Sequence, residues 1–346
     1  MTEQIRIAVL PGDGIGPEVI REASLVLRAA AQAEGIRIEL IEGLLGGVAI
    51  QACGVPLPEE TMELVRGSSA VLAGAVGGPA WDSLPERLNP GLGGMLRLRR
   101  ELDLFANLRP VVSLPGASPF LDILLVREAT GGAYFSMPRG RAAAEEVRAF
   151  DTIMYSEAQI TRVIRVAADL AESRSGRLAS IDKANVLESS RLWREVAERE
   201  LAGWDIEVEH LYVDNAAYQL ARDPSRFDVI VTENMFGDIL SDQLAGALGS
   251  LGLLPSAGLG TGTFGLYEPV HGSAFDITEH DVANPIGAIR SAAMLLRHSL
   301  GAIAAARRID DACTAVLSEG FGTRDTHPIH DVGTRELTRR ILERMR

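Results

Sequence analysis

Short aliphatic runs alternate with longer amphipathic stretches along most of this 346-residue chain. Runs rich in β-branched and aliphatic side chains predict strands, and the amphipathic stretches between them predict helices. The expected strands cover residues 5–10, 36–41, 70–75, 123–126, 178–182, 206–213 and 227–232. Strands in alternation with helices are typical of α/β proteins, in which helices cover a mostly parallel sheet. We therefore expect an α/β fold.

Several helix boundaries can also be read from the sequence. Pro17 is at a favoured first helical position, and Ser156 followed by Gln159 forms a capping-box pattern. The C-terminal part is mostly helical, with expected helices over residues 286–307, 311–319 and 333–345. With 47% hydrophobic residues, a chain of this length can bury a large core and divide into about two domains.

The composition narrows the classes of function. A net charge of −13 would repel a phosphate backbone, so nucleic-acid binding would need a local basic patch, for which Arg97, Arg99, Arg100 and Arg109 are the candidates. The longest weakly polar stretch, residues 291–306, is too short and too charged to span a bilayer. The N-terminal residues lack the pattern of a secretory signal. We expect a cytoplasmic protein with no nucleic-acid and no membrane partner.

Two glycine-rich segments invite a dinucleotide-binding interpretation. Residues 12–17 follow an expected strand and open a helix, but Gly16 arrives one residue too early for the Rossmann fingerprint. Residues 260–265 have the Gly-x-Gly-x-x-Gly spacing, yet the residues after them do not begin a helix. We therefore expect no Rossmann site, although glycines in both places can bring a ligand close to the backbone.

A pair of aspartates has the chemistry of a metal site. Asp238 and Asp242 are one helical turn apart, so both carboxylates project from the same helix face. Like charges at this spacing repel, and a hard divalent cation such as Mg²⁺ or Mn²⁺ would reverse that balance. Asp214 follows an expected strand and could supply a third carboxylate. The alternative is a solvated acidic helix face, which the apolar neighbours of the pair disfavour.

Three arginines and two aromatic side chains are further candidates. Arg99, Arg109 and Arg127 lie near expected strand or helix ends, and Arg127 directly follows the strand 123–126. Such a set suits a small polycarboxylate, because each guanidinium can bind a carboxylate with two parallel hydrogen bonds. Taken singly, each arginine could instead form a surface ion pair. Tyr134 could act as a general acid or be a core tyrosine, and His271 lies in a loop of small residues that a flat ligand could approach.

Lys183 is the only lysine among the 34 basic side chains of the chain. A guanidinium holds its proton at any physiological pH, whereas an ammonium group can give up its proton and take it back. One interpretation is therefore a role in proton transfer that arginine cannot fill. The other is a composition bias that replaced lysine by arginine and spared one position.

Together, five motifs resemble those of the β-hydroxyacid oxidative decarboxylases, the family of 3-isopropylmalate, isocitrate, homoisocitrate and tartrate dehydrogenases. They occur in order along nearly the whole chain and look most like the isopropylmalate branch. The motifs are Leu10-Pro-Gly-Asp-Gly-Ile-Gly-Pro-Glu18, Asp103-Leu-Phe-Ala-Asn-Leu-Arg-Pro110, Asp182-Lys-Ala-Asn-Val-Leu187, Phe236-Gly-Asp-Ile-Leu-Ser-Asp242 and Glu268-Pro-Val-His-Gly-Ser-Ala274.

The resemblance implies a two-domain, non-Rossmann α/β fold of the isopropylmalate/isocitrate dehydrogenase type. A discontinuous, large cofactor-binding domain would comprise residues 1–104 and 250–346. A central domain, residues 105–249, would hold the substrate and the metal and form the interface of a homodimer with shared active sites. The implied reaction is the NAD-dependent oxidative decarboxylation of a 3-substituted malate to a 2-oxo acid and CO₂, first of all 3-isopropylmalate in leucine biosynthesis.

The resemblance also implies a role for each candidate residue. Arg99, Arg109 and Arg127 would hold the carboxylates of the malate. Asp238 and Asp242, with Asp214 from the partner subunit, would bind Mg²⁺ or Mn²⁺, and Asp214 would also face the substrate. Lys183, again from the partner subunit, and Tyr134 would serve as base and acid.

A nicotinamide cofactor would lie along residues 74–87 and the loop 272–284. Asp276 and Ile277 match the NAD-preferring pattern of the family, in which an acidic residue accepts the adenosine ribose hydroxyls and would repel a 2′-phosphate. NAD is therefore expected rather than NADP. The expected cofactor-binding residues are Gly74, Ala75, Val76, Gly77, Gly78, His271, Gly272, Ser273, Ala274, Asp276, Ile277 and Asn284.

Three segments depart from the pattern of the family. In residues 89–98, which would contact the 3-substituent, the usual acidic residue near Leu92 is missing. Phe275 stands where proline is usual in the family. The connection formed by residues 113–122 looks shortened. A specialised paralogue that uses another 3-alkyl- or 3-arylmalate, or a tartrate- or homoisocitrate-type substrate, is therefore an alternative. A non-catalytic regulatory subunit is a more remote one, because the expected acid, base and metal ligands are all present.

Overall fold

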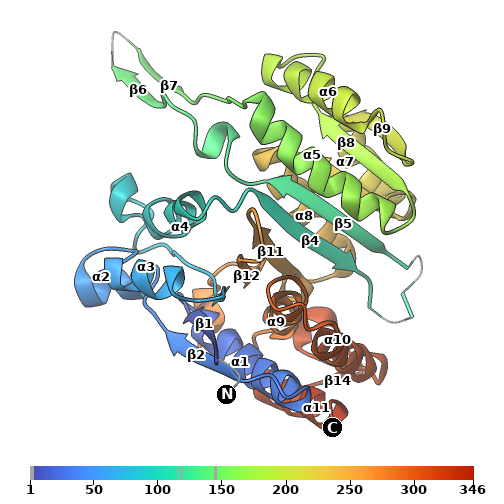
Figure 1. Cartoon of the computed structure of the whole chain (residues 1–346). Coiled ribbons are helices and arrows are strands. Elements are labelled where there is room, and N and C mark those ends of the chain that lie inside the picture. Colours follow the sequence, from blue (N-terminus) through green and yellow to red (C-terminus); the bar gives the residue numbers. More distant parts are fainter. Residues whose placement is uncertain (1–3, 115, 118–119, 144–145) are drawn as a thin grey trace. The chain divides into compact units, whose positions relative to one another are not determined.

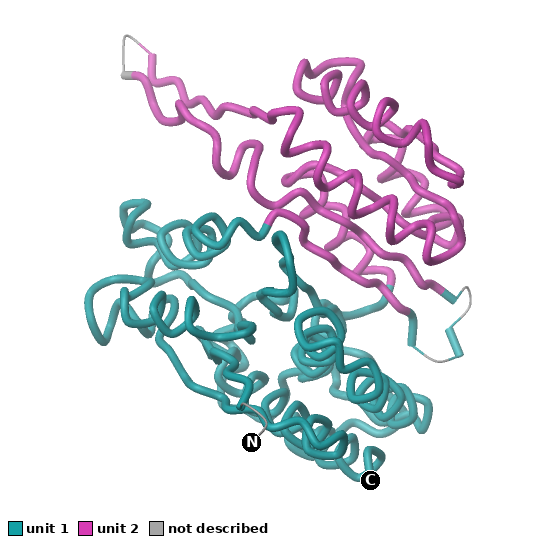
Figure 2. Tube along the Cα trace, viewed as in Figure 1, with its two compact units in different colours: residues 1–104, 113–120, 248–346 teal, residues 105–112, 121–247 magenta. Residues whose placement is uncertain are grey.

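The computed structural model describes residues 4–114, 116–117, 120–143 and 146–346 of the chain (Figure 1). The chain divides into two compact units (Figure 2). Unit 1 comprises Met1–Leu104, Ser113–Phe120 and Leu248–Arg346, and unit 2 comprises Phe105–Val112 and Leu121–Ala247. The chain thus enters unit 2 twice, and its C-terminal part returns to unit 1. The sequence-based division at 104/105 and 249/250 did not separate residues 113–120 from the central domain.

In unit 1, strand β1 (Ile5–Leu10) lies between the parallel strands β2 (Ile38–Glu42) and β3 (Ala70–Ala73). β12 (Gly265–Pro269) continues the sheet parallel to β3, and β11 (Pro255–Leu259) pairs with β12 in the antiparallel direction. All four residues of β3 are buried, as expected for a strand with both faces covered. The two remaining strands of the unit, β13 (Phe321–Gly322) and β14 (His330–Asp331), form a short separate pair.

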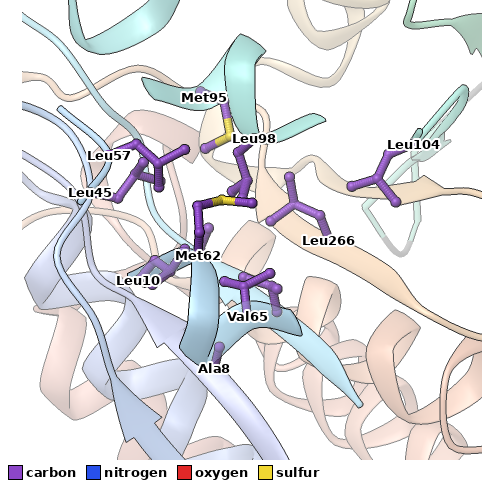
Figure 3. Packing of buried hydrophobic residues seen from close by; sticks show 12 residues of the cluster. Ala8, Leu10, Leu45, Leu57, Met62, Val65, Met95, Leu98, Leu104 and Leu266 are labelled. Atoms are coloured by element: carbon purple, nitrogen blue, oxygen red, sulfur yellow. The ribbon is translucent and has the colours of Figure 1, made fainter. Parts of the chain in front are cut away.

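Helices cover both faces of these strands. α1 (Gly16–Ala33), α9 (Ile286–His298), α10 (Ile303–Ser318) and α11 (Thr334–Arg344) pack on one another (Figure 1). α2 (Gly47–Cys53), α3 (Glu59–Arg66) and α4 (Arg97–Glu101) belong to the same unit. Figure 3 shows a core cluster in which Leu10 of β1 and Leu266 of β12 meet Met62 of α3 and Met95 and Leu98 near α4.

Unit 2 is built on five strands in the order β4 (Ala106–Val112), β5 (Asp122–Glu128), β10 (Val229–Thr232), β8 (Arg177–Asp182) and β9 (Glu207–Tyr212). β4 is antiparallel to β5, and the other neighbours are parallel. α5 (Glu157–Glu172) and α6 (Glu188–Leu201) pack together on one face, and α7 (Val213–Arg222) and α8 (Asn234–Leu248) lie behind the sheet in Figure 1. A hairpin of β6 (Gly140–Ala143) and β7 (Val147–Phe150) completes the unit.

The structure corrects several expected boundaries. The strand expected over residues 123–126 extends to Glu128, so Arg127 lies inside β5 rather than after it. The helix expected over residues 286–307 is divided in two: it ends at His298, Gly301 in the connection has a φ of +62°, and the next helix begins at Ile303. Strands β4, β11 and β12 were not expected, since their sequences lack a continuous apolar run.

Other expectations agree with the structure or lie outside the part that it describes. Ser156 and Gln159 form the predicted capping box of α5. The shortened connection 113–122 includes residues 115, 118 and 119, which lie outside the described residues, as do residues 1–3 of the N-terminus. Among the described residues, no helix combines the length and the apolar character needed to cross a bilayer.

Candidate active site

Strands β4 and β5 place two buried arginines on one face of the sheet of unit 2. Asn107 of β4 pairs with Arg127 of β5, and Arg109 follows Asn107 by two residues. All three side chains share a face, because side chains alternate along a strand and paired residues point to the same side. Arg109 Nε donates to Asn107 Oδ1 over 2.8 Å. Arg109 is 5% and Arg127 2% exposed, so both guanidinium groups need acceptors within the protein.

Helix α8 supplies the acceptors. Arg109 Nη2 lies 3.0 Å from Asp238 Oδ1, and Arg127 Nη1 donates to the same oxygen. Arg109 Nη1 donates to Ser241 Oγ over 2.6 Å and lies 3.6 Å from Asp242 Oδ1. Asp238 and Asp242 therefore both face Arg109. A Cβ at Gly237 would lie only 2.8 Å from Arg127 Cγ, so the helix can pass this close because position 237 is glycine.

Tyr134 donates to the same aspartate. It ends the short 3-10 helix η3 (Gly132–Tyr134), and its Oη lies 2.7 Å from Asp238 Oδ2. The guanidinium carbon of Arg127 lies 5.4 Å from the centre of the Tyr134 ring. Partial burial and the neighbouring Asp238 raise the pKa of Tyr134 to about 12. The phenol therefore holds its proton at neutral pH, as a general acid must.

Asp242 is the more open of the two carboxylates, with 55% of its side chain exposed against 33% for Asp238. Burial raises the pKa of Asp242, Arg109 opposes this shift, and the charge of Asp238 adds to it. Carboxylate oxygens are the ligands that Mg²⁺ and Mn²⁺ prefer. Among the described residues, however, no three His, Cys, Asp or Glu side chains are close enough together to hold a metal ion. A single chain therefore does not bring Asp214 to Asp238 and Asp242.

Asp214 instead pairs with Lys183. β8 and β9 are parallel neighbours in which Asp182 pairs with Tyr212, so the residues that follow these strands emerge side by side. Lys183 Nζ donates to Asp214 Oδ1, and this hydrogen bond lowers the pKa of Asp214. The Asp214 side chain is 68% exposed. The pair thus lies open to solvent at the carboxyl ends of the parallel strands, where α/β proteins place functional side chains.

Arg99 belongs to unit 1, where its guanidinium pairs with Glu268 of β12. Its neighbour Arg97 pairs with Glu101 over 2.6 Å. Arg109, which also belongs to the expected basic cluster, is buried in unit 2 and pairs with Asp238.

Asp13 connects three loops of unit 1, a role that the sequence did not predict. Its carboxylate accepts hydrogen bonds from Gly47 N (2.7 Å), Val48 N (2.8 Å) and Gly77 N (2.7 Å). Its own N–H donates to Ala75 O over 2.8 Å. The expected cofactor loop that begins at Gly74 is thus fixed to the glycine-rich turn after β1. An aspartate inside a glycine-rich turn was the one available signal, because such side chains often accept backbone N–H groups.

The second expected cofactor loop has buried polar atoms that lack partners. Ile15 N donates to Ser273 O over 2.8 Å, which ties this loop to the same turn. Within the described part of the chain, neither His271 Nε2 nor Ser273 Oγ has a hydrogen-bond partner, although both atoms are buried. Burial lowers the pKa of His271. Unpaired buried polar atoms are costly, so both atoms are available to a hydrogen-bonding partner that reaches this loop.

The remaining expected cofactor residues differ in their surroundings. Asp276 and Gly272 are exposed and Ile277 is half-buried. Asn284 is buried and uses both ends of its amide, accepting from Ile286 N over 3.1 Å and donating to Asp325 Oδ2 over 3.1 Å. Phe275 lies against Gly78, where a Cβ would come within 2.3 Å of its ring, and its ring centre lies 5.9 Å from that of Trp81.

Comparisons with known proteins agree with the arrangement of these elements. The chain matches the family described as isocitrate/isopropylmalate dehydrogenase over residues 6–341. It is 52% identical over 332 residues to the 3-isopropylmalate dehydrogenase of Carboxydothermus hydrogenoformans, which covers 92% of this chain and 88% of that protein. The 3-isopropylmalate dehydrogenase of Geobacillus kaustophilus is 53% identical over 335 residues, with 93% and 90% covered.

Solved structures show the same fold. The isocitrate dehydrogenase of Methylococcus capsulatus superposes with a TM-score of 0.90 at 34% identity, covering 99% of this chain and 100% of that one. A β-decarboxylating dehydrogenase of Thermococcus kodakarensis gives 0.81 at 36% identity, with 99% and 96% covered. The predicted family resemblance and the predicted α/β fold are both confirmed. This chain belongs to the isocitrate/isopropylmalate dehydrogenase family of oxidoreductases.

Proposed function

We propose that the chain catalyses the NAD- and divalent-metal-dependent oxidative decarboxylation of 3-isopropylmalate, a step of leucine biosynthesis. The observation that carries the proposal is the convergence of Arg109, Arg127 and Tyr134 on Asp238, with Asp242 one helical turn further on. This set combines cations for carboxylates, an acid and two hard oxygen ligands. The 3-isopropylmalate dehydrogenases that are about half identical to the chain support the choice of substrate.

The donor set fits a divalent metal. Asp238 and Asp242 supply carboxylate oxygens on one helix face, and their mutual repulsion favours a cation between them. We assign the third carboxylate to Asp214 of a second copy of the chain, since one chain does not bring the three together. When bound, the metal would stabilise negative charge that develops on the substrate oxygens.

The loops of unit 1 fit a dinucleotide. The unpaired atoms His271 Nε2 and Ser273 Oγ offer hydrogen bonds, and Asp276 is exposed at the position that would accept ribose hydroxyls. We therefore place NAD along Gly74–Gly78 and the loop that starts at His271. When bound, NAD⁺ would accept the hydride from C2 of the substrate.

The chain's own residues would bind the substrate and move its protons. Arg99, Arg109 and Arg127 would hold the substrate carboxylates through charge-assisted hydrogen bonds. Lys183, as the neutral amine that remains once its ammonium group has released a proton to solvent, would accept the proton of the C2 hydroxyl as the hydride leaves C2. After CO₂ departs, Tyr134 would deliver a proton to C3, for which its hydrogen-bonded and protonated phenol is suited. The products are a 2-oxo acid, CO₂ and NADH.

A homodimer with shared active sites would complete this set. In support of this, unit 2 exposes large apolar side chains that a partner would cover. On α7 and α8 these are Tyr218 and Ile239, exposed by 57% and 61%, and on the β6–β7 hairpin they are Val147 and Phe150, exposed by 67% and 44%. Location in the cytoplasm stays a prediction from the sequence.

One segment favours a second candidate substrate. In the π-helix over Pro90–Leu96, Met95 points into the core of unit 1, whereas Leu92 is 36% exposed, and the sequence of residues 89–98 contains no acidic residue. A contact surface changed in this way would suit another 3-alkyl- or 3-arylmalate. A non-catalytic regulatory subunit is disfavoured, since Tyr134, Lys183 and all three aspartates are present.

The test is a panel of 3-substituted malates assayed with NAD⁺ and Mg²⁺ or Mn²⁺, in which NADH and CO₂ are both measured. We expect equimolar NADH and CO₂, with the highest kcat/KM for 3-isopropylmalate. A higher kcat/KM for another 3-substituent would favour the paralogue. Absence of both products with every malate would contradict the proposed reaction.

A further inference from the structure

Asn234 has a position in unit 2 that the mechanism above does not use. It is the first residue of α8, two residues after the end of β10, and it is 1% exposed. A buried amide needs partners for both of its ends, because an unpaired donor or acceptor costs free energy. The partners of Asn234 therefore show what this side chain holds in place.

The two ends of the amide reach two different parts of the candidate site. Asn234 Oδ1 accepts from Arg127 Nε over 3.0 Å, on the opposite side of the guanidinium from the nitrogen that meets Asp238. Asn234 Nδ2 donates to the carbonyl oxygen of Gly131 over 2.9 Å. One side chain thus connects an arginine of β5 with the loop that leads to Tyr134.

The loop before Tyr134 is held from both sides at Gly131. Its N–H donates to Glu128 Oε2 over 2.8 Å, and its carbonyl accepts from Asn234. Space at this point is also restricted, since a Cβ at Gly131 would lie 2.5 Å from Tyr155 Cε1. If the amide is lost, the Gly131 carbonyl loses its donor, and the loop has little room to move toward another one. Tyr134, three residues further on, would then lose its fixed approach to Asp238.

We propose that Asn234 is a positioning residue that holds Arg127 and the loop of Tyr134 in place, so that both side chains reach Asp238. This inference rests on the proposed function, in which Arg127 binds the substrate and Tyr134 donates a proton. The acceptor end of the amide orients the binding group, and the donor end orients the acid. The two ends can therefore be separated by substitution.

Two variants separate them. Asn234→Ala removes both ends, and we expect it to raise the KM for 3-isopropylmalate and lower kcat, each by about 10- to 100-fold, as small displacements in an active site do. Asn234→Asp keeps an acceptor for Arg127 but turns the donor toward Gly131 into a second acceptor. We expect it to keep a KM within about threefold of the wild-type value while kcat falls about as far as in the alanine variant.

Tyr155→Phe is the matched control. The Tyr155 hydroxyl accepts from the backbone N–H of Asn234 over 3.0 Å and donates to Glu233 Oε2 over 2.7 Å, so this change disturbs the same buried network and leaves the amide intact. We expect a lower melting temperature with KM and kcat within about threefold of wild type, which separates stability from positioning. Thermal unfolding of all three variants checks that they fold.

The outcomes distinguish the inference from the proposed function. The positioning role is wrong if Asn234→Asp raises KM and lowers kcat together. It is also wrong if Asn234→Ala and Asn234→Asp both keep KM and kcat close to wild type, as Tyr155→Phe is expected to do. Calorimetric binding of 3-isopropylmalate with Mg²⁺ to the wild-type protein, and its turnover, test the proposed function separately. Wild-type turnover without the split would overturn only the role of Asn234, whereas no binding and no turnover in the wild type would overturn the function.

Discussion

The ammonium group of Lys183 and a guanidinium in its place would carry the same charge but differ in their ability to release a proton. Lys183→Arg should therefore keep the ion pair with Asp214, fold normally and bind substrate. We expect kcat to fall by about 10²- to 10⁴-fold, the usual contribution of an acid–base group. Steady-state kinetics, with calorimetric substrate binding as the control, measures this. Turnover near the wild-type rate would remove Lys183 from the proton path.

Tyr134→Phe keeps the ring beside Arg127 and removes only the hydroxyl that donates to Asp238. We expect kcat to fall by about 10²- to 10⁴-fold with little change in substrate KM. Because burial and Asp238 raise the pKa of Tyr134 to about 12, the wild-type rate should show no loss from ionisation of this phenol up to roughly pH 10. If the wild-type rate falls as the pH rises above neutral, and this fall is absent in Tyr134→Phe, the assignment would be contradicted.

At the scale of single residues, side chains of a type that suits acid–base or metal chemistry can be picked out of the sequence, whereas side chains that orient them cannot. Lys183, Tyr134, Asp238 and Asp242 stood out by residue type and motif. Asn234 did not, because its partners lie 107 and 103 residues away in the sequence. Only the register of β5 and β10 brings them together.

The turn after β1 joins the loop of Ser273 at a point where only glycine fits. Gly14 has φ of +58°, and a Cβ there would lie 1.9 Å from Ser273 O. Gly14→Ala should therefore displace the loop of His271 and Ser273 and weaken NAD binding by about 10-fold or more, in addition to a loss of stability. Calorimetric titration with NAD⁺ measures the first effect and thermal unfolding the second.

Gly35→Ala is the control for this change. Gly35 also has a positive φ, +69°, but no atom of the described residues lies within 4 Å of a Cβ built there. The substitution should cost about 1 kcal/mol of stability through backbone strain and leave NAD affinity unchanged. Equal NAD affinity of the two variants would show that the contact of Gly14 with Ser273 has no part in cofactor binding.

Asp228 ties three elements of unit 2 at the start of β10. Its carboxylate accepts from Arg174 Nε over 2.6 Å and from Ser175 N over 2.9 Å, and Arg174 also donates to Asp122 O of β5 over 2.8 Å. Burial raises the pKa of Asp228, but the hydrogen bonds from Ser175 and Arg174 outweigh it and leave this pKa below its usual value. The charged form therefore stabilises the folded state above the ordinary pKa, and this contribution is lost as the pH falls through the folded pKa.

Asp228→Asn should accordingly lower the free energy of unfolding by about 1–3 kcal/mol near neutral pH. The difference from wild type should shrink once the pH falls below roughly 4, where the wild-type carboxylate begins to take up its proton in the unfolded chain. Urea unfolding followed by circular dichroism across this range measures it. The exposed Asp223→Asn serves as control, and a difference that grows on acidification would contradict the assignment.

At the scale of elements, apolar runs in the sequence predicted strands well, whereas strands that carry polar residues were not predicted. β1, β5, β8, β9 and β10 were expected within a few residues, whereas β4 carries Asn107, Arg109 and Pro110 and was not among the expected strands. These polar side chains are tolerated because α8 supplies their partners. A strand whose polar face is satisfied by a distant helix leaves no local signal.

At the scale of the whole molecule, the prediction of a central domain inserted into a discontinuous one came from the family resemblance, because the composition shows no linker. The structure adds that one chain holds two separate groups of candidate residues. Asp238, Asp242 and Tyr134 form one, and Lys183 with Asp214 forms the other. Our central claim is that a complete active site takes the first group from one chain and the second from its partner.

Complementation between two inactive variants tests this claim most directly. Lys183→Arg and Tyr134→Phe are each unfolded, mixed in equal amounts and refolded together, and NADH release from 3-isopropylmalate is measured. If the site is shared, each mixed dimer holds one intact site, and the mixture should recover about a quarter of the wild-type activity. A mixture no more active than either variant refolded alone would show that Lys183 and Tyr134 act within the same chain, and would contradict the claim.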